Sequence, residues 1–538
     1  MRHSLAAGGL LLGMLSIAGS AHAAGPMSRY YADDTDGIFW FIHITDLHID
    51  TNDSKARSHL EYALNEVVDV VNPVAVFASG DLVNGTILGI PTSGQDPAEW
   101  DIYSTLLFDA NMEPTFFFDV PGNHDGYGDH GLTNYIESSM QGPATNGRLF
   151  VDAVHTTALG EYYFVGMNSA GTFDTPFTFG NPYFTNVDDL AAGLQAHASA
   201  QLVFVFAHHH LVDHGNTDAQ MVLGIGGADD PPGNVSEVLP LLEDSGAFYL
   251  HGHVHQYKES LQGNVVTVQL SNLASDPSVD RTSMEAWDQT KFESNIGIGI
   301  VDHNAFIYGV TDTTSPWPFV AITAPVDVNL EGGGTPPGSS TGVSYDGDYL
   351  DYGADKNPYA YDVCGARTDN PVRALVLSKE PVGSVSVSLD GSVLGLMTPA
   401  AAPAGIYTAA IDTSAVAPGL HDLTVTVVLG NEARSDSIQV NLTSGPCDPI
   451  GDAGVDAEPD ASGPDANLSD GGADAPANDA DQPEADADPT PGPDATGTND
   501  VGCSCSLPRQ TSSRGLAGLG GVLVAVALLR RRRGESKR

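Results

Sequence analysis

The sequence predicts a layered α/β domain followed by a small all-β, immunoglobulin-like sandwich. From Ile38 to about Val310, β-rich apolar runs alternate with amphipathic stretches, which is typical of α/β layers. After Pro316 the composition shifts towards Gly, Pro and Ser without a helical period, which indicates an irregular connection. Short alternating runs separated by turn signals such as Asp390-Gly391 then favour a sandwich. At 538 residues the chain is also too long for one hydrophobic core.

The predicted elements follow from these runs. The α/β part is expected to contain strands at 38–44, 74–78, 115–120, 162–167, 202–206, 247–250 and 265–270. Its expected helices are 54–70, 97–110, 187–198 and 235–242. The sandwich is expected to contain strands at 372–377, 382–389, 405–411, 419–428 and 436–442. Cys364 and Cys447 bracket these strands and could form a disulfide; two free thiols are the alternative.

Targeting signals are predicted at both ends of the chain. Arg2, an apolar run over 5–18 and the small-residue site Ala21-His22-Ala23 predict a signal peptide over 1–23, with a buried N-terminal helix as the alternative. Residues 448–502 form an acidic Asp/Ala/Pro/Gly stretch that is expected to be a disordered linker. The final segment, 503–538, holds two cysteines, a marginally short apolar run and four consecutive arginines, which favours a membrane stop. It resembles myxobacterial C-terminal sorting tags. We therefore expect an exported, cell-envelope or cell-surface protein.

Charge narrows the partners. The chain has 69 acidic and 21 basic residues, a formal net charge of -48. The electric field of such a negatively charged protein repels polyanions, which argues against nucleic acid as a bulk partner. An anionic substrate must then be small or be captured by local positive charge such as metal ions.

Five short motifs fall where the predicted strands end, which is the edge where open α/β sheets place their ligands. They are Asp46-Leu47-His48, Gly80-Asp81, Gly122-Asn123-His124-Asp125, Ala207-His208-His209-His210 and Gly252-His253-Val254-His255. Each motif alone is weak. Together, carboxylates mixed with imidazoles are what a first-row metal site requires.

In order and type, these motifs resemble those of the calcineurin-like metallophosphoesterases over about 38–312. The resemblance implies a four-layer αββα sandwich and two metal ions, for which Fe, Mn and Zn are all candidates. It implies that one ion is held by Asp46, His48 and His255, the other by Asn123, His208 and His253, and that Asp81 bridges both. A bridging hydroxide would then attack a phosphomonoester or phosphodiester.

The resemblance also implies a catalytic role for His124, as a general acid or transition-state stabiliser. A neighbouring carboxylate, Asp125 or Asp46, could hold its ring protonated. In the fourth motif, the metal ligand is assigned to His208, because it follows the strand expected to end at Phe206. His209 or His210 would be the ligand if the turn after that strand has another conformation.

Other polar residues are secondary candidates. Tyr127, His130, Asp213 and His214 follow the motifs and are candidates to line the pocket. The remaining histidines are assigned to the core (His43) or to solvent (His59, His155, His197, His303 and His421). No arginine follows Asp81-Leu82-Val83-Asn84-Gly85, which disfavours a protein-phosphatase substrate.

The expected organisation is a phosphoesterase domain over 35–315 and a β-sandwich domain over 316–447. The pair is similar to the transmembrane-protein-62-like subgroup. The predicted function is hydrolysis of a small phosphoester. The alternative is a catalytically inactive, metal-containing surface binding or adhesion protein.

Overall fold

The structure is a computed structural model, and it describes residues 34–85, 95–129, 131–171, 182–211, 232–253, 255, 257–274, 294–314, 317–331 and 355–444. The predicted signal peptide, acidic linker and C-terminal segment lie outside these residues, as do His130, Asp213, His214 and Cys447. Within the described part, no helix combines the length and apolar character needed to cross a membrane. The chain divides into two compact units, Met1–Pro459 and Asp460–Arg538, and all described residues belong to the first.

The first sheet is built around β1, a strand whose seven residues are all buried. Its order is β11-β10-β1-β2-β3, in which β1, β2 and β3 are parallel and β10 and β11 are antiparallel additions. The strands are β1 (Ile38–Ile44), β2 (Val76–Ala78), β3 (Phe117–Asp119), β10 (Asn295–Asp302) and β11 (Ala305–Asp312).

The second sheet has the order β4-β5-β6-β7-β9-β8. Its central strands β5, β6, β7 and β9 are parallel, and β4 and β8 close its edges in antiparallel pairing. The strands are β4 (Phe150–Thr157), β5 (Gly160–Met167), β6 (Leu202–Phe206), β7 (Phe248–His251), β8 (Lys258–Gln262) and β9 (Val265–Gln269).

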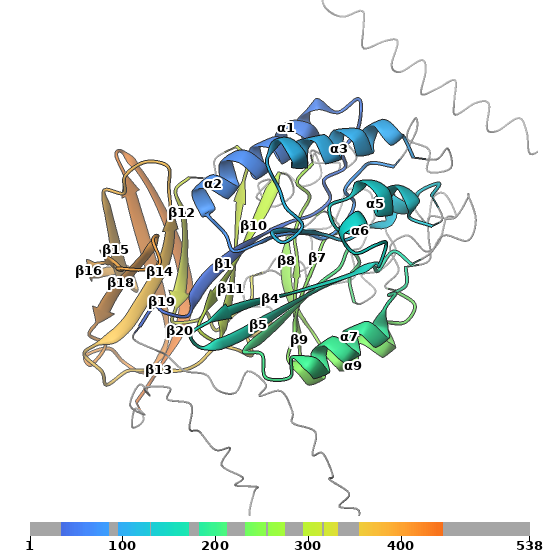
Figure 1. Cartoon of the computed structure of the whole chain (residues 1–538). Helices are drawn as coiled ribbons and strands as arrows, with labels where there is room; N and C mark the ends of the chain where they lie inside the picture. The colour runs from blue at the N-terminus through green and yellow to red at the C-terminus, as the bar shows by residue number, and fades with distance from the viewer. Residues whose placement is uncertain are drawn as a thin grey trace, which may run out of the picture. The chain divides into compact units, whose positions relative to one another are not determined.

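Helices cover the outer face of each sheet, so the domain has four layers (Figure 1). The helices are α1 (Ser54–Tyr62), the π-helical segment η1 (Ala63–Val67), α2 (Val68–Val71), α3 (Pro97–Asp109), α4 (Asn123–Gly126), α5 (Thr133–Ser138), α6 (Gln141–Ala144), α7 (Val187–Ala196) and α9 (Val235–Ser245). Between the sheets lies an aromatic core in which Phe41 packs edge-to-face on Phe77 and Phe164. The predicted α/β and all-β order is confirmed.

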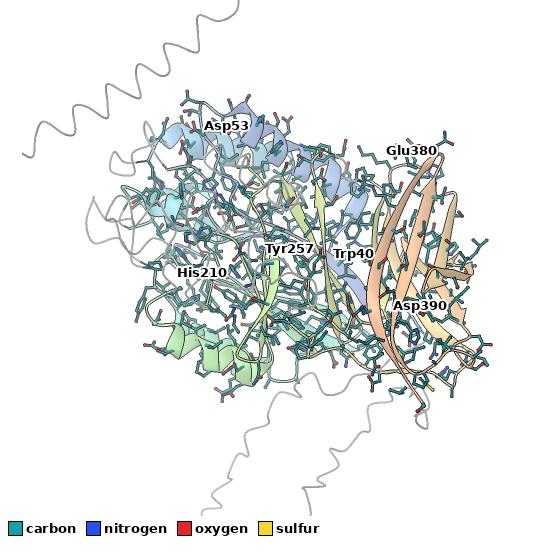
Figure 2. All side chains as sticks on the ribbon, turned by 180° about the vertical axis from the view of Figure 1, so that it is seen from behind. Trp40, Asp53, His210, Tyr257, Glu380 and Asp390 are labelled. Carbon is teal, nitrogen blue, oxygen red and sulfur yellow. The ribbon has the colours of Figure 1, made fainter. Side chains whose placement is uncertain are left out.

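The first helical run differs from the prediction of one regular helix over 54–70. The wider π-helical turn of η1 interrupts it while keeping Ala63, Leu64 and Val67 buried. At its end, Trp40 of β1 donates its indole N–H to the carbonyl of Val71 (2.6 Å), which ties the helical run to the sheet. Trp40 is labelled on β1 in Figure 2.

The C-terminal sandwich consists of two sheets, with the orders β12-β14-β18-β17 and β13-β20-β19-β15-β16. Its strands are β12 (Phe319–Ala324), β13 (Val363–Cys364), β14 (Asn370–Leu377), β15 (Ser384–Leu389), β16 (Ser392–Leu396), β17 (Thr398–Pro399), β18 (Ile406–Ile411), β19 (Gly419–Leu429) and β20 (Glu432–Thr443). The segment after Pro316 therefore supplies a strand, β12, where the sequence indicated only an irregular connection.

The sandwich shares a hydrophobic core with the α/β domain. Leu375 and Leu377 of β14 belong to the same buried cluster as Ile38 and Ile300. Beside this cluster, the buried guanidinium of Arg373 makes two hydrogen bonds with Asp302 of β10, at 2.8 and 2.9 Å. The prediction that His303 lies in solvent is wrong. His303 is 1% exposed, and its Nδ1 lies 2.6 Å from the Asp302 carboxylate.

Candidate metal centre

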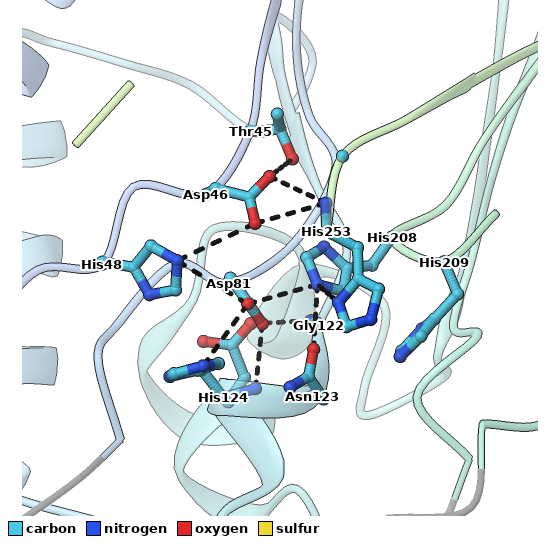
Figure 3. A network of polar contacts seen from close by, with 12 residues as sticks. Thr45, Asp46, His48, Asp81, Gly122, Asn123, His124, His208, His209 and His253 are labelled. Atoms are coloured by element: carbon cyan, nitrogen blue, oxygen red, sulfur yellow. Dashed lines mark hydrogen bonds and ion pairs between the residues drawn. The ribbon is translucent and has the colours of Figure 1, made fainter. Parts of the chain in front are cut away.

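The five motifs meet at one edge of the two sheets, because each follows the carboxyl end of a parallel strand. Asp46 follows β1, Asp81 follows β2 and Asn123 follows β3, whereas His208 follows β6 and His253 follows β7. Backbone hydrogen bonds hold neighbouring loops together: Asp46 N–H donates to Gly80 (3.0 Å) and Gly252 N–H donates to His208 (3.2 Å). Figure 3 shows the side chains of these loops pointing towards one another.

The backbone at this edge is unusual. Asp46, His48, Asp81, His253 and His255 all have positive φ, between 42° and 76°. This left-handed region is adopted by only a few per cent of non-glycine residues, and holding a residue there costs of order 1–3 kcal/mol. Five of the seven predicted metal ligands therefore share a backbone conformation that favours glycine. At these positions the placement of the side chain outweighs the cost of the backbone strain.

Asp46, His48 and His255 form the first cluster. His255 Nε2 lies 3.1 Å from Asp46 Oδ1 and 3.0 Å from His48 Nε2. The other carboxylate oxygen of Asp46 accepts hydrogen bonds from Thr45 Oγ1 (2.8 Å) and the His253 N–H (3.0 Å). These bonds fix the carboxylate so that Oδ1 faces the two imidazoles.

Asp81, His208, His253 and Asn123 form the second cluster. His208 Nε2 lies 3.2 Å from Asp81 Oδ2, 3.0 Å from Asn123 Oδ1 and 3.2 Å from His253 Nδ1. Its other ring nitrogen, Nδ1, lies 3.0 Å from the Ser79 carbonyl, which can only accept a hydrogen bond and thus assigns the ring proton to Nδ1.

Asp81 connects the clusters. Its Oδ2 lies 3.2 Å from His208 Nε2 in one cluster and 3.8 Å from His48 Nε2 in the other. Its Oδ1 accepts a 2.8 Å hydrogen bond from the His124 N–H. Oδ2 is thus the oxygen that the two clusters share.

The chemistry of the donor atoms fits metal ions. Three groups of atoms lie close enough to hold an ion: Asp46, His48 and His255; Asp81, His208 and His253; and His48, Asp81 and His124. Imidazole nitrogens and carboxylate oxygens converge in each group, and these are the ligand types that first-row metal ions take.

Burial and neighbouring charges shift the pKa values of the site residues. Burial disfavours the ionised form of Asp46, but His255 and His208 hold its pKa well below the usual range. Burial lowers the pKa of His208, yet Asp81 and Asp46 outweigh this effect and raise it to about 9. Burial and the neighbouring His124 lower the pKa of His48 to about 3. Burial also disfavours the ionised form of Asp81, but His208 and His124 hold its pKa well below the usual range. Asp46 and Asp81 are therefore ionised, as metal ligands must be.

His124 lies at the rim of the clusters. Its Nε2 is 3.9 Å from Asp81 Oδ2, and its Nδ1 is 2.6 Å from the backbone carbonyl of Asn84. The carbonyl, rather than the expected Asp125 or Asp46 carboxylate, is the partner of Nδ1, and it assigns a proton to that nitrogen.

Asp125 instead ties two motif loops together. Its carboxylate accepts hydrogen bonds from the N–H groups of Gly122 (2.7 Å), Val83 (3.0 Å) and Leu82 (3.2 Å). Burial and the nearby Asp81 raise its pKa to about 8, although the three N–H donors favour the ionised form.

Several residues that contact the proposed ligands lie outside the five motifs. Thr45, Ser79 and Ser169 orient ligand loops through single hydroxyl or carbonyl groups, and Ser169 Oγ accepts from the N–H groups of both His208 (3.1 Å) and His209 (3.0 Å). Tyr127, expected near the pocket, does lie there: its hydroxyl accepts a 2.7 Å hydrogen bond from Asn123. A lone Ser or Thr beside a motif gives no signal in one sequence.

Part of the chain is similar to proteins of known family. Residues 39–257 match the calcineurin-like phosphoesterase family. The chain is 28% identical over 138 residues to mouse (Mus musculus) transmembrane protein 62, covering 25% of this chain and 22% of that protein. It is 23% identical over 207 residues to a predicted metallophosphoesterase of Arabidopsis thaliana, covering 35% of this chain and 27% of the relative. The chain thus spans about a quarter of the length of these curated relatives.

Among solved structures, the chain is similar to GAP50, the anchor in the inner membrane complex of Plasmodium. The identity is 13%, the TM-score is 0.32, and the match covers 52% of this chain and 86% of that one.

Proposed function

We propose that this chain is a dinuclear, metal-dependent hydrolase of small phosphomonoesters or phosphodiesters, and the match of residues 39–257 to the calcineurin-like phosphoesterase family supports this. The observation that carries the proposal is the position of Asp81 Oδ2 between His48 and His208. One oxygen shared by two clusters of ligand atoms is the arrangement that a pair of adjacent ions requires.

We propose that Asp46, His48 and His255 hold one ion, that Asn123, His208 and His253 hold the other, and that Asp81 bridges them. Two ions in these positions would lower the pKa of a bound water and offset charge on the phosphoryl oxygens. Fe, Mn and Zn all suit these ligands.

Other groups of the chain orient the proposed ligands and His124. Thr45 and the His253 N–H hold the Asp46 carboxylate in one orientation, and the Ser79 carbonyl does the same for the His208 ring. His124 presents Nε2 at the rim, with Nδ1 held by Asn84. In its imidazolium form, His124 would donate the Nε2 proton to the leaving-group oxygen.

The location of the protein is part of the proposal. A signal peptide over 1–23 and a C-terminal membrane or sorting segment over 503–538 would place the phosphoesterase in the cell envelope or at the surface, with the acidic stretch 448–502 as a linker. A disulfide between Cys364 and Cys447 would suit that environment. Peptide mapping without reducing agent would detect it.

The test is hydrolysis by the purified full chain of a nitrophenyl monoester and a bis-nitrophenyl diester, after loading with Mn, Zn or Fe. Asp81→Asn keeps the size of the side chain but removes the charge shared by the clusters. We expect metal-dependent turnover in the wild type and a loss of at least about 100-fold in the variant. Full metal loading without turnover on either ester class would instead favour the inactive binding protein.

A further inference from the structure

Gln95 lies two residues before the start of α3 at Pro97, and its carboxamide contacts the turn that carries His124. Its Nε2 donates to the backbone carbonyls of His124 (3.1 Å) and Asp125. Its Oε1 accepts from the indole N–H of Trp100 (2.7 Å) and from Asn134 Nδ2 (3.0 Å). Both hydrogens and both acceptor positions of the amide are therefore used.

The orientation of this amide is fixed by the nature of its partners. An indole nitrogen can only donate, and a backbone carbonyl can only accept. A flipped Gln95 would place its oxygen against the two carbonyls and its nitrogen against the Trp100 N–H. Trp100 is 2% exposed and packs edge-to-face on Tyr103 and Tyr135, so it cannot readily move away.

His124 is thus held on both of its peptide groups. Its N–H donates to Asp81 Oδ1 (2.8 Å), and its carbonyl accepts from Gln95 (3.1 Å). The ring has its own anchor through Nδ1, on the carbonyl of Asn84. Gln95 touches none of the proposed metal ligands in these hydrogen bonds. Its effect falls on the backbone that aims the His124 ring.

We propose that Gln95, oriented by Trp100, is the positioning residue for proton donation by His124. It sets how well the site hydrolyses esters whose leaving group must be protonated. The inference rests on the proposed phosphoesterase function and deepens it. An alkoxide leaving group needs a proton as the ester bond breaks, whereas a nitrophenolate departs without one. A misaimed His124 therefore penalises alkyl esters selectively.

The molecule supplies a matched control. Gln141 is also a buried glutamine, 4% exposed, whose Nε2 donates to two backbone carbonyls, those of Pro114 (2.7 Å) and Phe117 (2.8 Å). These carbonyls flank the start of β3 rather than the His124 turn. Gln95→Met and Gln141→Met each remove a pair of hydrogen bonds donated to backbone carbonyls, while largely keeping side-chain volume. Gln95→Met also removes the two hydrogen bonds that Oε1 accepts from Trp100 and Asn134.

The experiment compares alkyl and nitrophenyl esters of the class that the wild type hydrolyses, using the metal-loaded full chain. Thermal unfolding and bound metal are measured in parallel. Gln95→Met should lower kcat on the alkyl ester about 10- to 100-fold and on the nitrophenyl ester less than about 3-fold, with unchanged metal content. Trp100→Phe should shift the same ratio in the same direction. Gln141→Met should lower thermal stability and leave the ratio unchanged.

Three results would overturn this inference without overturning the proposed function. Two of them are equal losses on both esters in Gln95→Met and the same selectivity in Gln141→Met. Loss of metal together with activity in Gln95→Met would also contradict it, since the residue would then support the clusters instead of His124. A wild type that binds metal and hydrolyses no ester would overturn the proposed function and this inference with it.

Discussion

At the three-histidine turn after β6, His208 Nε2 faces Asp81 and Asn123, whereas His209 Nδ1 lies 3.0 Å from Ser169 Oγ. His208→Ala should therefore reduce bound metal from two ions to about one, because it removes a ligand of one cluster only. His209→Ala should retain both ions. Elemental analysis of the two purified variants checks this, and metal loss in His209→Ala alone would transfer the ligand role to His209.

Asp125 gives a second prediction at this scale. In Asp125→Asn, an amide group replaces one of the oxygens that accept from Gly122, Val83 and Leu82. A buried donor left without an acceptor costs about 1–3 kcal/mol, so the free energy of unfolding should fall by that amount. Urea unfolding measures it, with exposed Asp69→Asn as the control. If stability were unchanged while alkyl-ester turnover fell, Asp125 would be a charge partner of His124 after all.

The proposed site residues could be predicted from the sequence, but most of their hydrogen-bond partners could not. Asp-x-His and Gly-Asn-His-Asp are recognisable because several uncommon polar residues stand together at strand ends. The partner of His124 Nδ1 is a backbone carbonyl, that of Asn84, and carbonyls are present at every position of a sequence. Gln95 likewise lies outside every motif, so only its place in the fold reveals its contact with His124.

At the scale of loops and strands, the close approach between motif loops depends on missing side chains. A Cβ added to Gly122 would meet the backbone nitrogen and carboxylate of Asp81. Gly122→Ala should therefore displace Asp81 and lower turnover and bound metal together, by at least about 10-fold in turnover. Gly395 of β16 has open space at the same point, so Gly395→Ala should retain wild-type activity. Normal metal content in Gly122→Ala would show that the loops can separate without cost.

Buried strands were predicted well because their apolar runs are continuous. β1 and β6 have the predicted bounds, 38–44 and 202–206. The edge strand β8, Lys-Glu-Ser-Leu-Gln, was missed because it is polar, and β10 was missed because glycines dilute its apolar run. The π-helical turn η1 was also unforeseen, since it keeps the same residues buried as a regular helix would.

At the scale of the whole molecule, the buried Arg373–Asp302 pair joins the sandwich to the α/β domain. Arg373→Met leaves Asp302 buried without its guanidinium and should cost about 3–5 kcal/mol of unfolding free energy. Because the two parts share one hydrophobic cluster, calorimetry of the wild type should show them unfolding together. Two well-separated transitions for these parts would contradict the shared core.

The same junction should respond to pH through His303. Burial disfavours its charge, but Asp302 and Asp34 outweigh this and raise its pKa. A raised pKa in the folded state means that the stabilisation is complete below the ordinary histidine pKa of 6.5 and is lost as pH rises through the folded value. His303→Gln should therefore lower stability in urea more at pH about 5.5 than at pH about 9. A pH-independent difference would exclude the ion pair as its cause.

The left-handed backbone at five of the proposed ligand positions exposes the protein to a particular kind of evolutionary decay. A change from His255 to Gly or Asn would relax a backbone held at φ 58° while deleting the ligand. A descendant with this change would lose the proposed metal-dependent hydrolysis and gain backbone stability in the same step. Selection on folding alone would thus favour inactive descendants, and only continued demand for the reaction would preserve these loops.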